Sequence, residues 1–470
     1  MLTLSNRYYY LIIILAAAIP ILFKEQILWL IPVPIILYLM LTNSKRAVII
    51  ISFVAFIALN SGLGETLRLV IQLLTITALS FLFFKNYGTQ FDKYPKLPSQ
   101  IIFLVIFVLI TMLFSLLFTK YIILGVEQVI RSIIFFIIVY LYYSLISNST
   151  DIKYFLYALY AGAFVYFSLL LYEIVKVNFD FINLNQNIFW EEGFSFVHRN
   201  VIGSFFSICI SIITAFVVVS NSTNKYRRYF FISIIFLLLG LILTNSRGAI
   251  ISLTISTGYI FYLANRKALK KFVLSILILL PLLFISEISD LISIYFRLER
   301  ISTGRDYILE TVYNILSNNP IIGAGPAAAK FEMYNYMPYM LGTPQEFYLT
   351  KHIKQIDFGH AHNFYLFLYT DLGILGLIVS LLFPITFIMM GNKLIQEMKT
   401  HTNSYYALVL GIQAAGIAIF VRGIFEWAGI FSYGTITYDL PFWWIFLIMI
   451  FIYQKYIVEK KDLKLLSFKN

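Results

Sequence analysis

Three side chains have types and surroundings suited to group-transfer chemistry: Arg247, Arg305 and His362. An arginine guanidinium presents planar N–H donors that match two oxygens of a phosphate. A histidine imidazole exchanges protons near neutral pH and therefore suits general-base catalysis. Together they predict a site that binds an anionic substrate and removes a proton from its reaction partner. Each also has an ordinary interpretation: an arginine extending toward lipid headgroups, a solvated loop arginine and an interfacial histidine.

Arg247 lies in a short polar turn, Thr244–Ala249, between two apolar runs. The turn contains no acidic residue, so its sequence offers the guanidinium no carboxylate partner. Small Gly248 and Ala249 allow neighbouring helices to approach closely. This arrangement favours a bound phosphate as the partner of Arg247.

Arg305 lies in a long polar segment, at the expected start of a short helix. Thr303 and Asp306 have the spacing of a helix N-terminus, and Asn318-Asn319-Pro320 is expected to end the helix. The apolar positions Ile308, Val312, Ile315 and Leu316 recur at helical spacing. Arg305 would then be near the exposed N–H groups of the first turn, which also favour an anion.

Metal and nucleotide chemistry are not indicated by the motifs. His360 and His362 lack a third ligand at a recognisable spacing, and Cys209 is the sole cysteine, inside an apolar run. The sequence contains neither a phosphate-binding P-loop nor a dinucleotide-binding motif. We therefore expect no metal and no cofactor. A reaction on the outer face must then use energy stored in its substrate.

The elements that position these residues are membrane helices. Of 470 residues, 60% are hydrophobic and 12% are charged, against roughly 25% charged in soluble domains. Continuous apolar runs of helical length predict an all-α, polytopic protein with about fourteen transmembrane helices. The runs lie near 8–23, 27–42, 46–62, 66–84, 99–118, 121–147, 153–175, 201–220, 227–244, 248–265, 272–286, 363–391, 403–425 and 437–454.

The distribution of lysine and arginine predicts the orientation in the bilayer. Placing both termini in the cytoplasm puts most of the basic loop residues inside, as expected for short cytoplasmic loops. This topology accounts for most of the net charge of +12, so a nucleic-acid partner is not needed. The chain then divides into helices within 1–286, one large extracytoplasmic loop at 287–361, and helices with a cytoplasmic tail within 362–470. The first apolar run has no cleavage pattern and is expected to remain as an anchor.

Other polar groups lie in or beside the predicted helices. Glu127 with Arg131, and Arg422 with Glu426, have i, i+4 spacing, which is typical of ion pairs within a helix. Intramembrane charges usually face each other or a cavity. The alternative hypothesis is therefore that Arg131 and Arg422 line a substrate pocket. Arg199 and Asn200, at the start of the eighth run, and Asn363, beside His362, are further candidates for substrate contact.

Several of these segments together resemble a known superfamily. They are Thr244–Ala249, Arg305 with Pro320–Gly325, and His362–Leu366 running to Gly373–Gly376. Their order and their placement around one long outer loop resemble the O-antigen ligase and O-antigen polymerase superfamily. The resemblance implies a GT-C-like glycosyltransferase architecture in the bacterial plasma (inner) membrane. It also implies inverting, metal-independent transfer of lipid-linked sugars on the outer side of this membrane.

The resemblance also implies roles for individual residues. Arg247 and Arg305 match the arginines taken to hold the diphosphate of an undecaprenyl-diphosphate donor, and His362 matches the histidine taken to activate the acceptor hydroxyl. Asn200 matches an asparagine often found at that place. The family's loop arginine is often followed by tryptophan, whereas Asp306 follows here. Either of two other arginines could therefore hold that role: Arg297 or Arg300.

Three functions are compatible with this sequence. A polysaccharide polymerase would join lipid-linked oligosaccharide repeats as both donor and acceptor, with a chain-length regulator as an expected partner. An O-antigen ligase would use the same donor and a lipid A core as acceptor. A lipid-linked oligosaccharide flippase would have a similar number of helices, but it does not need a large outer loop carrying arginine and histidine. The length and predicted span count favour the polymerase, of an O antigen or a capsule.

Overall fold

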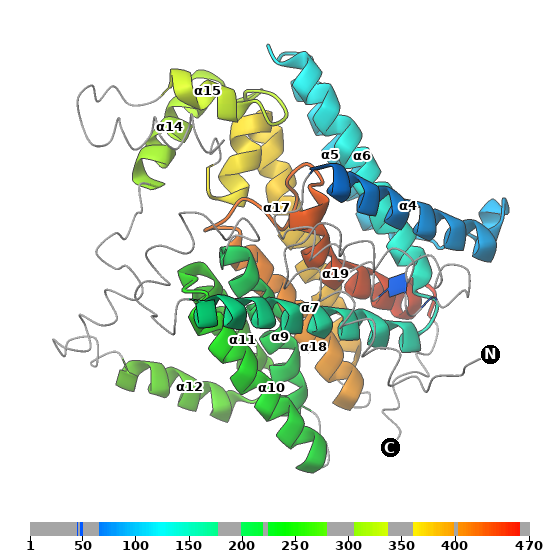
Figure 1. Ribbon diagram of the computed structural model, residues 1–470, viewed down its shortest axis with the longest axis vertical. Helices are drawn as coiled ribbons and strands as arrows, with labels where there is room; N and C mark the ends of the chain where they lie inside the picture. Colours follow the sequence, from blue (N-terminus) through cyan, green and yellow to red (C-terminus); the bar gives the residue numbers. More distant parts are fainter. Residues whose placement is uncertain are drawn as a thin grey trace.

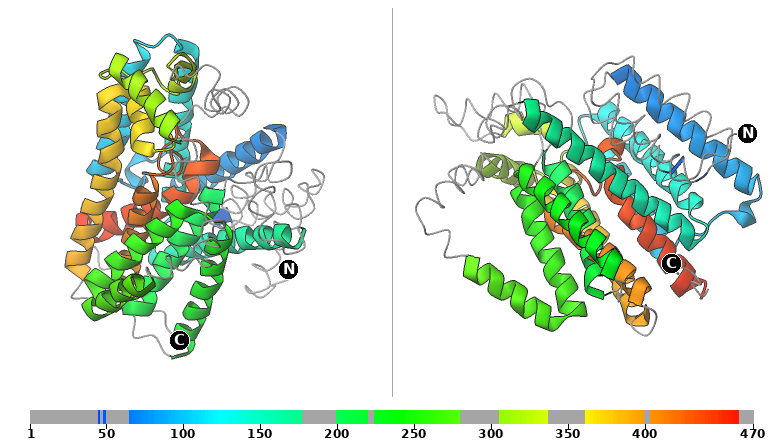
Figure 2. Two further views of the ribbon diagram at one scale, coloured as in Figure 1. Left: turned by 90° about the vertical axis from the view of Figure 1, so that its left-hand side faces the viewer. Right: turned by 60° about the horizontal axis from the view of Figure 1, so that its bottom comes forward.

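The computed structural model describes residues 45, 48–49, 65–176, 199–219, 224–279, 305–336, 361–398 and 403–460. Within these ranges the regular elements are helices, which lie side by side in a layered bundle (Figures 1 and 2). The longer helices are α4 (Glu65–Tyr87), α5 (Ser99–Leu116), α6 (Ile122–Leu145), α7 (Ser149–Lys176), α9 (Arg199–Val219), α10 (Asn224–Leu243), α11 (Arg247–Ala264), α12 (Arg266–Leu279), α14 (Arg305–Asn318), α17 (Phe364–Met398), α18 (Asn403–Arg422) and α19 (Ile436–Tyr453). The shorter ones are η2 (Phe91–Lys93), α15 (Ala329–Asn335) and the π-helical η6 (Gln454–Val458).

The predicted apolar runs within the described ranges are confirmed as helices. Six described helices are long and apolar enough to cross a membrane, which confirms a multi-pass membrane protein. They are α5, α6 and α17, most of α9 and α18, and most of α19 with η6. The predicted runs at 8–23 and 27–42 lie outside the described residues, as do most of 46–62 and the end of 272–286.

Helices α9, α11 and α18 pack against one another, with α10 packed against α9 (Figure 1); among the candidate spans, α9, α18 and α19 are the most buried. Their interface contains small polar residues that bridge the helices. The hydroxyls of Ser211 and Ser256 lie 2.7 Å apart, and those of Ser207 and Ser252 lie 3.4 Å apart. Short side chains allow close approach, and each hydroxyl also bonds within its own helix, as with Ser211 Oγ to Ser207 O at 2.7 Å. This rigid group of helices supports the candidate site at one of its ends.

The predicted single span at 363–391 is wrong in one respect: the chain reverses inside it. Gly373 has φ 64° and ψ −156°, which interrupts α17. The rings of Phe364 and Phe383 lie 6.0 Å apart, although a straight helix would separate them by about 28 Å. The arm 364–372 therefore runs beside the long arm 374–398, and the two stand next to each other in Figure 1. Gly373 makes this turn.

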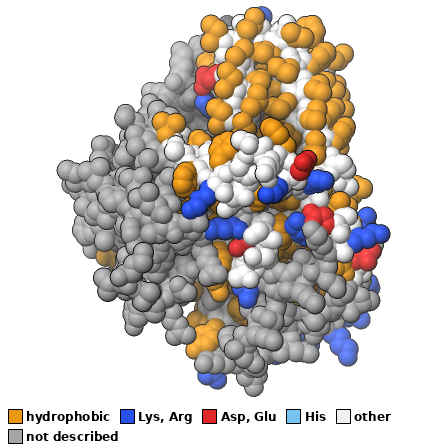
Figure 3. Space-filling view, turned by 90° about the vertical axis from the view of Figure 1, so that its right-hand side faces the viewer, with side chains coloured by type: hydrophobic (Ala, Val, Ile, Leu, Met, Phe, Trp, Pro, Cys, Tyr) orange, Lys and Arg blue, Asp and Glu red, His pale blue; other side chains and the backbone are white. Residues whose placement is uncertain are grey.

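An apolar surface covers α5 and α6 (Figure 3). Large hydrophobic side chains are exposed along both helices, among them Phe103, Ile110, Ile123, Ile130 and Ile137. A soluble protein seldom exposes so continuous an apolar face. The surface fits contact with the lipid hydrocarbon that these two candidate spans would cross.

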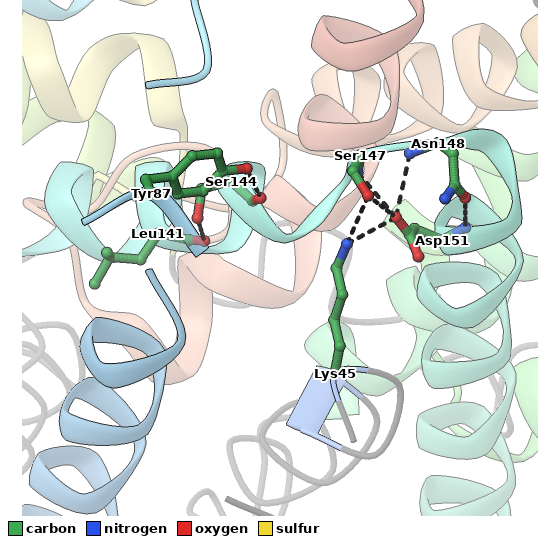
Figure 4. Close-up of polar contacts among 7 residues, drawn as sticks. All are labelled: Lys45, Tyr87, Leu141, Ser144, Ser147, Asn148 and Asp151. Atoms are coloured by element: carbon green, nitrogen blue, oxygen red, sulfur yellow. Dashed lines mark hydrogen bonds and ion pairs between the residues drawn. The ribbon is translucent and has the colours of Figure 1, made fainter. Parts of the chain in front are cut away.

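A polar network fixes the junction between α6 and α7 (Figure 4). Asp151 Oδ2 accepts hydrogen bonds from the backbone N–H groups of Ser147 (2.8 Å) and Asn148 (3.2 Å), and Asn148 Oδ1 accepts one from Asp151 N (3.1 Å). This reciprocal pattern is a capping box that starts α7. Lys45 Nζ lies 2.9 Å from the same carboxylate oxygen, so the segment near residue 45 is tied to this junction. By the predicted topology the junction is on the cytoplasmic side.

Candidate active site

A buried carboxylate, an imidazole and an amide meet where three separate segments come together. Glu426 follows the end of α18, His362 precedes α17, and Asn200 lies in the first turn of α9. Asn200 Nδ2 donates to Glu426 Oε1, and His362 Nδ1 lies 3.9 Å from Glu426 Oε2. The exposed fractions of the His362 and Glu426 side chains are only 12% and 7%. The structure therefore brings together two of the predicted site residues, His362 and Asn200, around a third that was predicted only to pair within its helix.

The position of His362 is fixed by the residues that follow it. Asn363 Oδ1 accepts hydrogen bonds from the N–H groups of Tyr365 (2.9 Å) and Leu366 (3.0 Å), so Asn363 caps the first arm of α17. Its amide Nδ2 donates to Ile424 O (3.0 Å). The backbone N–H of Phe364 donates to Gly423 O (2.7 Å). These bonds hold the segment carrying His362 against the segment carrying Glu426, which gives Asn363 a structural role.

His362 itself has φ 47°, in the left-handed region that L-residues rarely occupy. Such a conformation costs of order 1 kcal/mol or more and persists only where the surroundings hold it. Here the helix cap on one side and the contacts to the 423–426 segment on the other hold it. The backbone therefore directs the imidazole toward Glu426.

Glu426 belongs to a buried loop, residues 423–435, between α18 and α19. The predicted span at 403–425 ends three residues early, at Arg422, because this loop begins there. Asp439 anchors the loop by accepting from Gly429 N (3.0 Å), Ser432 N (2.6 Å) and Ser432 Oγ (2.9 Å). Trp443 Nε1 donates to Ile430 O (2.5 Å). A loop satisfied in this way has a fixed shape inside the protein.

Arg422 is 1% exposed and supports the same loop. Its Nη1 donates to Ala428 O (2.6 Å), and its guanidinium carbon lies 4.9 Å from the centre of the Phe442 ring. We predicted an i, i+4 pair between Arg422 and Glu426, or a role for Arg422 in a substrate pocket. In the structure the carboxylate of Glu426 contacts Asn200 and His362, whereas Arg422 bonds to the loop backbone.

The turn that carries Arg247 packs beside this cluster. A Cβ added to Gly203, one turn after Asn200, would meet Thr244 Oγ1 at 2.7 Å and Ser246 Cβ at 2.8 Å. A Cβ added to Gly248 would meet Phe425 Cβ at 3.1 Å, next to Glu426. The turn thus packs between the start of α9 and the 423–435 loop. Half-buried Arg247 is the first residue of α11 and lies at the same end of the bundle as Asn200 and Glu426.

The large polar segment docks onto the turn of α17. Gly325 N donates to Asp371 O (2.7 Å), Ala324 N donates to Thr370 O (3.0 Å), and Thr119 Oγ1 donates to Ala324 O (2.7 Å). A Cβ added to Gly323 or to Gly373 would collide with the backbone of the other segment. Gly323 and Gly373 therefore face each other. This contact holds the segment that follows α14 against α17.

Asp371 completes this attachment from inside the bundle. Its Oδ1 accepts from Ala329 N (2.9 Å), and its Oδ2 accepts from the hydroxyl of Tyr433 (2.8 Å). Burial first, and then the adjacent carboxylate, raise the pKa of Tyr433 well above its ordinary value, so the phenol remains a donor. One buried aspartate thus connects the large polar segment, α17 and the 423–435 loop.

The remaining predicted residues have separate positions. The helix predicted around Arg305 is confirmed: α14 begins at Arg305 and ends at Asn318, and buries Ile308, Val312 and Ile315. The side chains of Arg305 and Arg199 lie outside the described residues, as do Arg297 and Arg300. Arg131 forms the predicted pair with Glu127 (2.8 Å), and both side chains are exposed on α6.

Sequence reasoning missed the partnership of Glu426 with His362. The signal for it was an ionisable residue inside an apolar run, which usually faces a partner or a cavity. Local spacing pointed to Arg422, which does interact electrostatically with Glu426, whereas His362 and Asn200 come from segments 64 and 226 residues away in the chain. Only the packing of α9, α17 and α18 identifies them.

These observations define a multi-pass helical membrane protein with a buried polar site where an aqueous segment docks. Residues 232–381, which carry Arg247, Arg305 and His362, match the family model described as O-antigen ligase. This match covers 150 of the 470 residues and supports the predicted resemblance to the O-antigen ligase and polymerase superfamily. No curated protein matches the chain.

Proposed function

We propose that this protein is a bacterial surface polysaccharide polymerase, which joins undecaprenyl-diphosphate-linked oligosaccharide repeats on the outer face of the plasma membrane. The observation that supports this most is the meeting of His362, Asn200 and Glu426 beside the Arg247 turn. All of these residues lie at helix ends that the predicted topology places on the outer side. The family match includes the same turn and the same histidine.

The proposed reaction needs only groups of the chain and its substrates. His362 removes the proton of an acceptor hydroxyl, a role that typically contributes 10² to 10⁴-fold in rate. The hydroxyl oxygen attacks the anomeric carbon from the face opposite the diphosphate, and the anomeric configuration inverts. Arg247 and Arg305 stabilise the negative charge that develops on the departing diphosphate. The donor is already activated, so no nucleotide is consumed.

An O-antigen ligase is the second candidate, because the matching family model carries that description. The two enzymes share the donor chemistry and differ in the acceptor: another lipid-linked repeat, or a lipid A core. The buried site would carry out the donor chemistry that the two enzymes share. The acceptor distinguishes the two.

A gel of surface polysaccharide from a deletion strain tests the proposed function. A polymerase deletion is expected to leave single repeats attached to the anchor. Loss of all attached glycan would instead indicate a ligase. Lipid-linked units trapped on the inner face would indicate a flippase and contradict the glycosyltransferase proposal.

Arg247→Lys tests whether the guanidinium holds a diphosphate. Lysine keeps the positive charge but loses the planar pair of donors. We expect transfer to fall by about tenfold to a hundredfold, the loss of one to two charge-assisted hydrogen bonds. Transfer rates of the purified variants with a lipid-diphosphate donor would measure this.

Arg266→Lys is the matched control, because Arg266 is an exposed arginine at the start of α12, and its guanidinium carbon lies 4.7 Å from the centre of the Tyr262 ring. It is expected to retain the wild-type rate. A wild-type rate for Arg247→Lys would show that Arg247 does not hold the diphosphate through a planar pair of N–H donors.

A further inference from the structure

Glu426 is a buried carboxylate whose two oxygens face two different partners. Oε1 accepts a hydrogen bond from the Asn200 amide, and Oε2 faces Nδ1 of His362 at 3.9 Å. The Glu426 backbone N–H donates to Arg422 O (3.0 Å), which continues the last turn of α18 and fixes the side chain's origin. A carboxylate placed this deeply is costly unless other groups compensate its charge.

The orientation of the imidazole follows from this contact. Nδ1 is directed at Glu426, so Nε2 is the nitrogen that can accept a proton from a substrate hydroxyl. A negative charge near Nδ1 favours a proton on that nitrogen, which leaves Nε2 as the basic one. The distance of 3.9 Å exceeds a hydrogen bond by about 1 Å. It is short enough for strong attraction once the imidazole is positively charged.

We propose that Glu426 is the positioning residue of the general base: it orients the His362 imidazole and stabilises the imidazolium, and Asn200 holds Glu426 in place. This inference rests on the proposed role of His362. In the transfer step, the hydroxyl proton moves to Nε2, the C–O bond to the acceptor forms, and the bond from the anomeric carbon to the diphosphate oxygen breaks. The departing diphosphate takes the electron pair. Glu426 gains no proton and touches no substrate.

The role of Asn200 changes accordingly. It was predicted to contact substrate, yet its amide hydrogen-bonds to Glu426. A donor at this position stabilises the carboxylate and fixes its orientation. Asn200 would then act on the reaction through Glu426 and His362.

The test compares Glu426→Gln with Glu426→Asp in purified protein, with kcat and KM measured separately for a lipid-diphosphate donor. Glutamine keeps the size and loses the charge, whereas aspartate keeps the charge and is one methylene shorter. If Glu426 had only a structural role, Glu426→Gln would retain a higher kcat than Glu426→Asp, because the shorter aspartate leaves a gap. The inferred role predicts the reverse order: kcat falls at least tenfold in Glu426→Gln and recovers partly in Glu426→Asp, with KM unchanged in both.

Two further variants make the result specific. Glu397→Gln makes the same exchange at an exposed site near the far end of α17 and should retain the wild-type kcat. In a His362→Gln background, Glu426→Gln should lower the residual rate no further, because the two residues act as one unit. Should Glu426→Gln fail to accumulate, Asn200→Ala takes its place, with a several-fold fall in kcat and unchanged KM expected.

The outcomes separate this inference from the proposed function. Inactive His362→Gln together with wild-type kcat in Glu426→Gln would overturn the positioning role and leave the base intact. Wild-type kcat in Asn200→Ala, where that variant is used, would do the same. An active His362→Gln enzyme would overturn the base itself, and with it this inference.

Discussion

Replacement of His362 by alanine is expected to lower the rate of glycosyl transfer by about 10² to 10⁴-fold, the contribution of a positioned general base. The protein should still accumulate in the membrane. The cap of α17 is made by Asn363, and the Phe364 backbone makes the contact to Gly423 just after α18, so neither depends on the imidazole. Transfer by purified protein, with membrane abundance measured in parallel, would check both expectations.

Backbone strain can be separated from loss of the imidazole. His362 has φ 47°, which alanine tolerates poorly and asparagine tolerates better. His362→Asn should therefore retain the wild-type melting temperature and still lose activity to the same degree. His401→Ala, in the segment between α17 and α18, is the matched control and should be active. Rapid transfer by His362→Asn would contradict the base role.

Replacement of Gly373 by alanine is expected to disrupt both the fold around the site and the activity. A Cβ at this position would collide with the carbonyl of Ile321, and its φ of 64° disfavours any side chain. Alanine at a positive φ alone costs about 1 kcal/mol, and overlap with backbone atoms adds typically 1 to 3 kcal/mol. We expect a lowered melting temperature in detergent and loss of transfer, because the 320–329 segment no longer docks on α17.

Gly258→Ala is the control for this experiment. Gly258 lies within α11, and the nearest heavy atom to an added Cβ is Phe272 Cε1 at 3.9 Å. Alanine there should leave stability equal or slightly higher, because it favours the helix. A Gly373→Ala protein that melts and reacts like the wild type would show that the docking of the loop on α17 is unimportant.

The helices could be predicted from the sequence because a span in hydrocarbon needs an uninterrupted apolar run of known length. The runs at 99–118 and 121–147 agree with α5 and α6 to within a few residues. The helix from Arg305 to Asn318 was also predictable, because its apolar positions recur at helical spacing and Asn319-Pro320 follows. These features are local, so the sequence carries them directly.

The reversal of α17 was not predictable in the same way. Gly373 sits inside an apolar run long enough to cross the membrane, and a glycine there ordinarily indicates helix packing. Its turn depends on a segment about fifty residues earlier, because the backbone of Ile321 and Ile322 occupies the space beside Gly373. The feature belongs to the tertiary contact between two segments and is absent from either one alone.

The candidate site likewise combines local features, which the sequence predicts, with tertiary contacts, which it does not. Residue types and motif order were enough to select His362, Arg247 and Asn200. The Glu426 carboxylate was predicted to pair with Arg422, because i, i+4 spacing places two side chains on one face of a helix. The loop after α18 bends Glu426 toward α9 and α17 instead. Residues that come together from the ends of three helices can be identified only from the structure.

The most direct test of the proposed activity is reconstitution of the purified protein in liposomes with an undecaprenyl-diphosphate-linked oligosaccharide as its only substrate. Product chains and released undecaprenyl diphosphate would be measured together. We predict chains longer than one repeat, one released lipid diphosphate for each new glycosidic bond, and an inverted anomeric configuration. Wild-type protein that is folded and yet leaves the oligosaccharides unjoined, with or without moving them across the bilayer, would contradict a polymerase.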